Sequence, residues 1–198
     1  MISIYNIKPK FQQALQPFLL TLNRLGVRPN QITNSAIGLS FFLGLILFLF
    51  SESSTVYFIL PFGLLLRMML NALDGMMARQ YNQKSAIGEV LNELGDVVSD
   101  LFIFIPFAFV TGLNPILIWL FALGSVINEF SGILAKVVSG NRRYDGPMGK
   151  SDRAFLIGAI ALMMGFQLID VYWINGLFLL AFLLTLLSSF LRILNALK

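Results

Sequence analysis

Long apolar runs separated by short polar turns form the main pattern of the chain after residue 30. A helix needs about 20 mostly apolar residues to cross a bilayer. Each run can supply that length, and the second and third runs extend past it. The pattern therefore predicts six transmembrane helices, at residues 31–51, 55–80, 84–111, 114–139, 151–170 and 173–195.

The first 30 residues have a different pattern. They lack the basic start, apolar run and small-residue cleavage site of a signal peptide. Apolar residues recur there at helical spacing: Phe11, Leu15, Phe18, Leu19 and Leu22. Basic residues flank them: Lys8, Lys10, Arg24 and Arg28. This predicts an amphipathic helix lying on the cytoplasmic leaflet, and a packing face against the bundle fits the spacing equally well.

The composition supports a membrane protein, with 57% hydrophobic and 12% charged residues among 198. We expect an all-α integral membrane fold in a single domain over residues 1–198. Residues 1–30 form its juxtamembrane segment and 31–198 its six-helix bundle. Because the chain has no cysteine and no histidine, it forms no disulfide, and acid–base chemistry falls to carboxylates. The net charge of +4 indicates membrane topology rather than nucleic-acid binding.

Positive charge alternates between the turns. Lys84 lies by the second turn, and the fourth contains Arg142, Arg143 and Lys150, whereas the first, third and fifth turns have neither Lys nor Arg. The positive-inside rule then places both termini in the cytoplasm.

Residues 71–100 hold five of the chain's ten acidic residues: Asp74, Glu89, Glu93, Asp96 and Asp100. Ionisable groups near membrane depth are costly and usually functional. One helical face is formed by residues spaced three and four apart: Asn71, Asp74, Gly75 and Ala78. At about 100° per residue, the acidic residues from position 89 onward gather on another face, beside Asn92.

These two faces predict a metal and phosphate site at the cytoplasmic end of the second and third spans. Oxygen ligands from two helices suit a hard divalent cation, Mg²⁺ or Mn²⁺, with phosphate oxygens completing its shell. Gly75 and Gly88 allow close approach of a nucleotide or a neighbouring backbone. The planar fork of Arg79 suits phosphate.

The same stretch resembles the signature of the CDP-alcohol phosphotransferase family, D-x-x-D-G-x-x-A-R followed by G-x-x-x-D-x-x-x-D. The matching residues are Asp74, Gly75, Ala78, Arg79, Gly88 and Asp96. Asn71 and Asn92 stand at the first and third aspartate positions. The resemblance implies an integral membrane enzyme of phospholipid synthesis with six transmembrane helices.

By this resemblance Asp96 is the general base, and the ligands of one or two Mg²⁺ or Mn²⁺ ions are Asn71, Asp74, Asn92 and Asp96. An amide oxygen still coordinates Mg²⁺ but is neutral, which predicts a single ion or a weaker second one. Glu93 and Asp100 are further candidate ligands, because their helical phase could restore the missing charge.

The resemblance also implies a CDP-binding set: Asn30, Thr33, Asp74, Gly75, Ala78, Arg79 and Gly88. Asn30 and Thr33 belong to a P-N-x-x-T segment. From the residues alone, Asn30 is equally a helix cap.

Four further ionisable residues lie near the predicted site. Arg67 needs an anionic partner, for which Asp74, a substrate phosphate and snorkelling to the interface are the alternatives. Glu129 pairs with Arg67 or Arg79, lines the cavity or joins helices. Lys150 and Arg153 begin the fifth span, where Ser151 is a candidate cap. The helix N-terminus favours phosphate there, and the resemblance implies an acceptor phosphate nearby.

The implied reaction transfers a phosphatidyl group from a CDP-linked donor, such as CDP-diacylglycerol, to an acceptor alcohol and releases CMP. The alternative is a catalytically silent relative that binds nucleotide or lipid, which the two asparagines favour. A transporter fits the sequence less well, because no continuous row of polar residues crosses the membrane. The expected setting is the inner membrane of a bacterium, as a homodimer with a cytoplasmic site.

Overall fold

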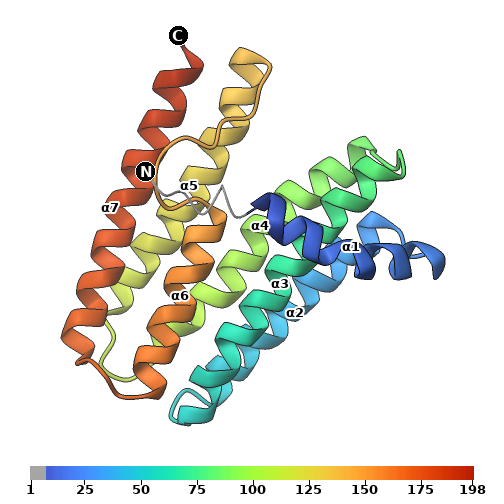
Figure 1. The fold of residues 1–198 in the computed structure, drawn as a ribbon. Coiled ribbons are helices and arrows are strands. Elements are labelled where there is room, and N and C mark those ends of the chain that lie inside the picture. Colours follow the sequence, from blue (N-terminus) through green and yellow to red (C-terminus); the bar gives the residue numbers. More distant parts are fainter. Residues whose placement is uncertain (1–7) are drawn as a thin grey trace.

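The computed structural model describes residues 8–198, which form helices and no strand (Figure 1). The elements are α1 (Lys8–Arg24), α2 (Pro29–Leu49), α3 (Ser54–Gln80), α4 (Ala86–Phe104), the 3-10 helix η2 (Ile105–Phe109), α5 (Pro115–Ser139), α6 (Lys150–Gly165) and α7 (Val171–Ala196). Residues 1–7 of the predicted juxtamembrane segment lie outside the described residues.

Within residues 8–198, four helices are long and apolar enough to cross a membrane: α2, α3, α5 and α7. Their ends agree closely with the first, second, fourth and sixth predicted spans. The apolar pattern was sufficient here because each run is bounded by polar or proline-containing turns. The chain is therefore an all-helical integral membrane protein.

The third and fifth predicted spans differ from the observed helices. The third is divided, with α4 ending at Phe104 and η2 following, because Pro106 has no backbone N–H to continue the α-helical ladder. The fifth is shorter than predicted, since α6 has 16 residues, about 24 Å of helix. Neither α4 nor α6 meets the length and composition of a span, so the count of six is not confirmed.

The helices pack in two groups that meet along α3 and α6 (Figure 1). In one group α5 and α7 lie side by side, and in the other α2 packs against α3 and α4. Phe104, Phe107, Phe121 and Phe178 are wholly buried in the apolar core. The rings of Phe104 and Phe121 lie 4.8 Å apart between centroids, which packs the end of α4 against α5.

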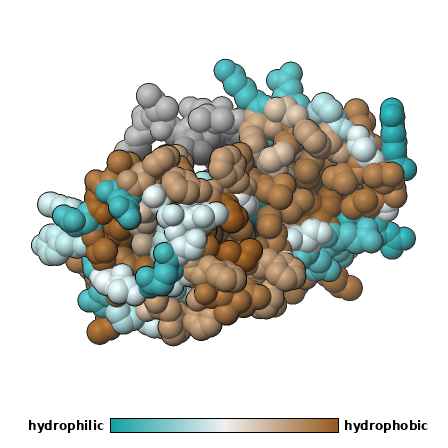
Figure 2. All heavy atoms as spheres, turned by 90° about the horizontal axis from the view of Figure 1, so that it is seen from below, coloured by the Kyte–Doolittle hydropathy of each residue, from teal (hydrophilic) through white to brown (hydrophobic). Residues whose placement is uncertain are grey.

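The outer surface is largely apolar, as Figure 2 shows for one face. Phe62 and Trp173, for example, are 74% and 63% exposed. Exposure of large apolar side chains on this scale fits a surface covered by lipid rather than water.

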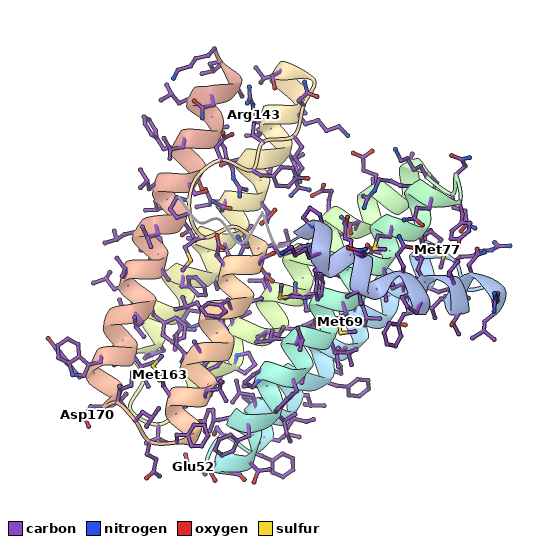
Figure 3. All side chains as sticks on the ribbon, viewed as in Figure 1. Glu52, Met69, Met77, Arg143, Met163 and Asp170 are labelled. Carbon is purple, nitrogen blue, oxygen red and sulfur yellow. The ribbon has the colours of Figure 1, made fainter. Side chains whose placement is uncertain are left out.

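Helix α1 crosses over α3 (Figure 1). Leu15 and Leu19 are buried against a cluster that includes Leu73 and Met77, while Phe18 is 56% exposed. Figure 3 places Met69 and Met77 close to this helix. The packing interpretation of α1 is thus confirmed for one side of the helix, and another side remains open to a membrane surface.

The two ends of the bundle differ in charge. Figure 3 shows Glu52 and Asp170 at one end and Arg143 at the other. The turn between α3 and α4, which contains Lys84, lies toward the same end as Arg143 (Figure 1). The alternation of charge seen in the sequence therefore becomes an acidic end and a basic end.

Candidate active site

The motif residues of α3 and α4 meet toward the basic end of the bundle. The Asn71 side-chain amide donates to Asp96 Oδ1 at 3.4 Å, joining the two helices. Thr33 Oγ1 of α2 donates to Asp74 Oδ2 at 2.9 Å. Asp74 also lies close enough to Asp96 to interact with it electrostatically. Three helices therefore bring two buried carboxylates together, as the helical spacing predicted.

Asp96 forms an ion pair with Lys150, the first residue of α6. The Lys150 side chain is 32% exposed, whereas that of Asp96 is 7% exposed. The lysine thus approaches a nearly buried carboxylate from the open side. This contact brings the predicted Lys150 to the motif, although the two residues are 54 positions apart.

A second group of charges includes Glu93 and Asp100, which lie about one helical turn before and after Asp96 on α4. We call it the ion-pair cluster, and its members are Arg67, Glu93, Asp100, Glu129, Arg142 and Arg153. Asp100 accepts from Arg67 at 2.7 Å and from Arg153 Nη2 at 2.7 Å and Nε at 2.9 Å. Glu129 accepts from Arg153 at 2.7 Å and from Arg142 at 2.5 Å.

The cluster decides between the expected roles of two residues. Arg67 pairs with Asp100 rather than with Asp74. Glu129 pairs with Arg153 rather than with Arg67 or Arg79, and it thereby joins α5 to α6, which was one of its expected roles. The reason is tertiary packing, since α3 packs against α6 and α4 against α5, and Arg153 of α6 then reaches Asp100 and Glu129.

Glu93 and Asp100 also have arginine partners, where helical phase suggested metal ligands. Glu93 pairs with Arg142, and Asp100 with Arg67 and Arg153. Helical phase placed both carboxylates on the correct side of α4, but it could not show which neighbour would face them.

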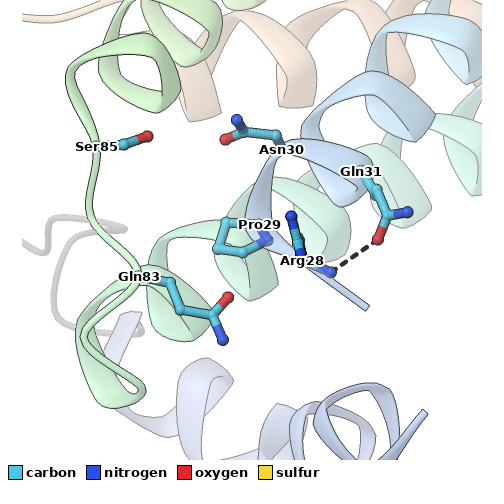
Figure 4. A pocket seen from close by; sticks show the side chains of 6 residues that line it. All are labelled: Arg28, Pro29, Asn30, Gln31, Gln83 and Ser85. Atoms are coloured by element: carbon cyan, nitrogen blue, oxygen red, sulfur yellow. Dashed lines mark hydrogen bonds between the residues drawn. The ribbon is translucent and has the colours of Figure 1, made fainter. Parts of the chain in front are cut away.

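Of the residues expected around CDP, Asn30 lines a cavity of about 520 Å³ (Figure 4), whereas Thr33, Asp74, Gly75, Ala78 and Arg79 are not among its lining residues. The cavity opens between the start of α2 and the α3–α4 turn, and its lining residues are Arg28, Pro29, Asn30, Gln31, Gln83 and Ser85. Gly88 borders it closely, because a Cβ there would lie 2.9 Å from Asn30 Oδ1 and 3.0 Å from Ser85 Oγ. Any larger residue at position 88 would push Asn30 away.

Arg79 is exposed at the end of α3 and takes part in no ion pair among residues 8–198. Its guanidinium bends back along the helix, and a Cβ on Gly75 would lie 3.1 Å from Arg79 Nη1. Glycine at position 75 therefore leaves room for the guanidinium beside Asp74. Ala78 lies on the same helix, half-buried, with no polar group to offer.

The two candidate caps are wrong. Helix α2 begins at Pro29, with Arg28 as its N-cap residue and its N–H donating to Gln31 Oε1 at 2.8 Å, so Asn30 is left free to face the cavity. Helix α6 begins after Gly149, whose N–H donates to Asp152 Oδ2 at 3.1 Å, and Ser151 is exposed.

Sequence reasoning missed two arginines. Arg142 was interpreted only as topogenic charge, yet it bridges Glu93 and Glu129. Arg192 is 1% exposed on α7 and donates to the Asn128 carbonyl at 2.6 Å. A lone arginine inside an apolar run was the available signal, because such a residue needs buried partners.

Asp74, Asp96 and Asn71 bring together oxygen atoms of the kinds that a hard divalent cation takes as ligands. Among the described residues, no group of three or more Asp, Glu, His or Cys side chains is arranged to hold a metal. Asp74 and Asp96 lie near one another, and each has only one short side-chain partner. Carboxylate and amide oxygens are suitable ligands for Mg²⁺ or Mn²⁺ when phosphate oxygens supply the rest.

Comparison with known sequences gives a family. The sequence model of CDP-alcohol phosphatidyltransferase matches residues 27–193. Inner membrane protein YnbA of Escherichia coli is 40% identical over 185 residues, which cover 93% of this chain and 92% of that protein. Cholinephosphotransferase 1 of Danio rerio is 29% identical over 106 residues, covering 50% of this chain and 28% of the relative.

Two solved structures share the fold. They are of the phosphatidylinositol phosphate synthase PgsA1 of Mycobacterium tuberculosis, one with CDP-DAG bound and one in complex with manganese and citrate. Both align with a TM-score of 0.74 at 19% identity over 92% of this chain, covering 92% and 88% of the respective neighbours. At this identity the likeness is one of fold.

Proposed function

The chain belongs to the CDP-alcohol phosphatidyltransferase family, and from this premise we propose that it is an active transferase. It moves a phosphatidyl group from a CDP-linked donor, such as CDP-diacylglycerol, to the hydroxyl of an acceptor alcohol. The observation that carries the proposal is the meeting of Asp74, Asp96 and Asn71 across α3 and α4.

Asp96 is the proposed general base. The acceptor oxygen forms a bond to the phosphorus next to the diacylglycerol oxygen, and the bond from that phosphorus to CMP breaks. The acceptor proton passes to Asp96. For this step Lys150 must move off the carboxylate, and its partly exposed side chain at the start of α6 has room to do so. A positioned carboxylate base contributes about 10²–10⁴-fold in rate.

A single divalent ion, Mg²⁺ or Mn²⁺, is proposed between the two motif helices. Its protein ligands are Asp74 and Asp96, with the amide oxygens of Asn71 and Asn92. When bound, the ion neutralises charge on the diphosphate as CMP leaves. Glu93 and Asp100 are not included, because arginines hold them.

The donor's nucleotide is proposed to enter the cavity beside Asn30 and Gly88. Arg79 holds a diphosphate oxygen, since its guanidinium is exposed and free of carboxylates in the described chain. Thr33 acts through its hydrogen bond to Asp74, which orients that carboxylate. Gly75 and Ala78 have small or no side chains, so the diphosphate can approach the backbone of α3 closely.

The proposed setting is the bacterial inner membrane, as supported by the likeness to an inner membrane protein. We propose one domain over residues 1–198, with α4 and α6 completing six membrane crossings and α1 on the cytoplasmic surface. The basic end with Arg143 faces the cytoplasm by the positive-inside rule, with both termini and the site on that side. A homodimer is proposed from family membership.

The test is release of CMP. Purified protein in nanodiscs receives CDP-diacylglycerol, Mg²⁺ or Mn²⁺ and a panel of alcohols, with Asp96→Asn as the control. We expect release that requires both a metal and one acceptor, and a loss of about 10²–10⁴-fold in the control. Binding of CDP-diacylglycerol without release from any alcohol contradicts the transferase.

A catalytically silent, nucleotide-binding relative is the second candidate. The Lys150–Asp96 ion pair favours it, because the pair occupies the proposed base. Lys150→Gln separates the two. In a transferase this change leaves metal-dependent CMP release measurable, whereas in a silent protein it alters only the affinity for the nucleotide.

A further inference from the structure

The charges around Asp96 carry an inference about the acceptor. Resting on the proposed transferase function, we infer that the acceptor is an unphosphorylated alcohol, because the arginines around Asp96 are held by buried carboxylates and, in the described part of the chain, Lys150 is the one cation there that can move. A phosphorylated acceptor would bring a dianion into this space and would need cations that are free to receive it.

Lys150 and Arg67 are the two cations that touch Asp96 directly. Lys150 pairs with its carboxylate. Arg67 donates to its carbonyl oxygen at 3.4 Å and is held by Asp100 at 2.7 Å, with its side chain 2% exposed. Lys150 is released when Asp96 acts as the base, so it offers a single positive charge, whereas Arg67 stays enclosed beside Asp100.

Arg153, which lies at the phosphate-favouring start of α6, has no donor left for a ligand. Its Nε and Nη2 donate to Asp100, and Nη2 also reaches Glu129. Its Nη1 donates to the Met148 carbonyl at 3.0 Å and to Asn128 Oδ1 at 3.4 Å. The side chain is 0% exposed, so a phosphate could reach it only by displacing a buried carboxylate.

Arg142, at the outer edge of the ion-pair cluster, is the fourth cation that is paired with carboxylates. It bridges Glu93 and Glu129, and its side chain is 13% exposed. The four cations Lys150, Arg67, Arg153 and Arg142 therefore face four carboxylates, which are Asp96, Asp100, Glu129 and Glu93.

Among residues 8–198, no other cation makes a hydrogen bond or ion pair with Asp96. Arg192 is buried, with donors on the carbonyls of Asn128 and Asp145. Arg143 donates to the Asn195 carbonyl near the end of α7 (Figure 3). Arg79 is assigned to the donor's diphosphate. Fixed carboxylates would repel an acceptor phosphate, and like-charge contacts of this kind oppose binding strongly.

The test compares matched acceptors that differ only in a phosphate. CMP release is measured with wild-type protein in nanodiscs containing CDP-diacylglycerol, for glycerol and glycerol 3-phosphate, serine and phosphoserine, and inositol and inositol 1-phosphate. We expect one unphosphorylated member to react about tenfold faster or more than its phosphorylated partner. A faster phosphorylated member overturns the inference while leaving the transferase function intact.

A binding measurement decides the question even without turnover. Titration of glycerol 3-phosphate into the wild type should show no saturable binding, whereas Glu93→Gln, which leaves Glu129 as the one carboxylate on Arg142, should gain it. Glu89→Gln is the matched control, because it removes a carboxylate from the same helix but frees only the exposed Lys136. Saturable wild-type binding that Lys150→Gln or Arg153→Gln abolishes would show that a phosphate site exists and end the proposal.

Discussion

The motif pair Asp74–Asp96 and the ion-pair cluster around Asp100 differ sharply in how their carboxylates are held. Asp96 and Asp100 are one turn apart on α4 and equally buried, with 5% and 2% exposure. Asp100 accepts three short bonds from two enclosed arginines. Asp96 has a partly exposed lysine and a long contact from Asn71.

This difference distinguishes a carboxylate that is fixed in its ion pairs, Asp100, from one that can exchange its partners, Asp96. A carboxylate enclosed by arginines cannot exchange partners without exposing unpaired buried charge. A carboxylate with a partly exposed lysine and a weak amide contact can exchange them for a cation or a proton. Burial and helical spacing are the same for both residues, so only the identity of the partners distinguishes them.

Removing the charge of Asp100 should give the largest effect on stability. In Asp100→Asn, Arg67 loses its carboxylate partner in a buried site, and breaking such a pair costs about 3–5 kcal/mol. The measurement is reversible unfolding in detergent micelles. Asp74→Asn is the control, and it should cost only about 1 kcal/mol, because the amide oxygen still accepts from Thr33. Equal losses in both variants would erase the distinction between the two regions.

Adding a carboxylate to the motif should strengthen metal binding there, in contrast to the loss of stability expected at Asp100. Asn71→Asp adds a charged oxygen beside Asp96, and we expect Mn²⁺ to bind about tenfold more tightly. The measurement is a Mn²⁺ titration followed by electron paramagnetic resonance. Asn82→Asp, in the exposed α3–α4 turn, adds the same charge away from the motif. A similar gain from both changes would indicate a non-specific charge effect.

Arg79 should affect the ligand without affecting the fold. Because it is exposed and makes no ion pair within residues 8–198, Arg79→Gln should leave the unfolding temperature unchanged. It should weaken CDP binding about tenfold through the loss of a charge-assisted contact to phosphate. Calorimetric titration with CDP measures this, with Arg24→Gln at the exposed end of α1 as the matched control. Unchanged CDP affinity would remove Arg79 from the proposed site.

The smallest effect is expected at the exposed pair Lys136–Glu89. Their side chains are 46% and 56% exposed, so water screens the pair. Lys136→Gln should change the free energy of unfolding by about 0.5 kcal/mol or less. Unfolding under the conditions used for Asp100→Asn checks this. A loss comparable to that of Asp100→Asn would mean that enclosure is not what makes the cluster important.

Much of the fold was predictable because it depends on local patterns. Four spans, the position of the α3–α4 turn and the alternation of charge between turns all follow from runs of neighbouring residues. The early ends of α4 and α6 were not predicted, although each also has a local cause in one or two residues. Pro106 ends α4 early, and α6 stops at Gly165, just before Gln167 takes a left-handed backbone with φ of 53°.

The candidate site was predictable only in part. The spacing of Asn71, Asp74 and Asp96 indicated that they share faces of two adjacent helices, and the structure brings them together. The same spacing could not separate Asp96 from Asp100, because both have the same helical phase within one turn.

By itself, the sequence determined the membrane class, the ends of the main helices and the set of oxygen-bearing residues at the motif. Tertiary structure alone decided which charges meet. Arg67 reaches Asp100 across 33 residues, and Arg153 reaches it across 53. Such partners are chosen by the packing of α3 against α6 and of α4 against α5. An ion pair in a buried site depends on distances of a few ångströms, which no local periodicity encodes.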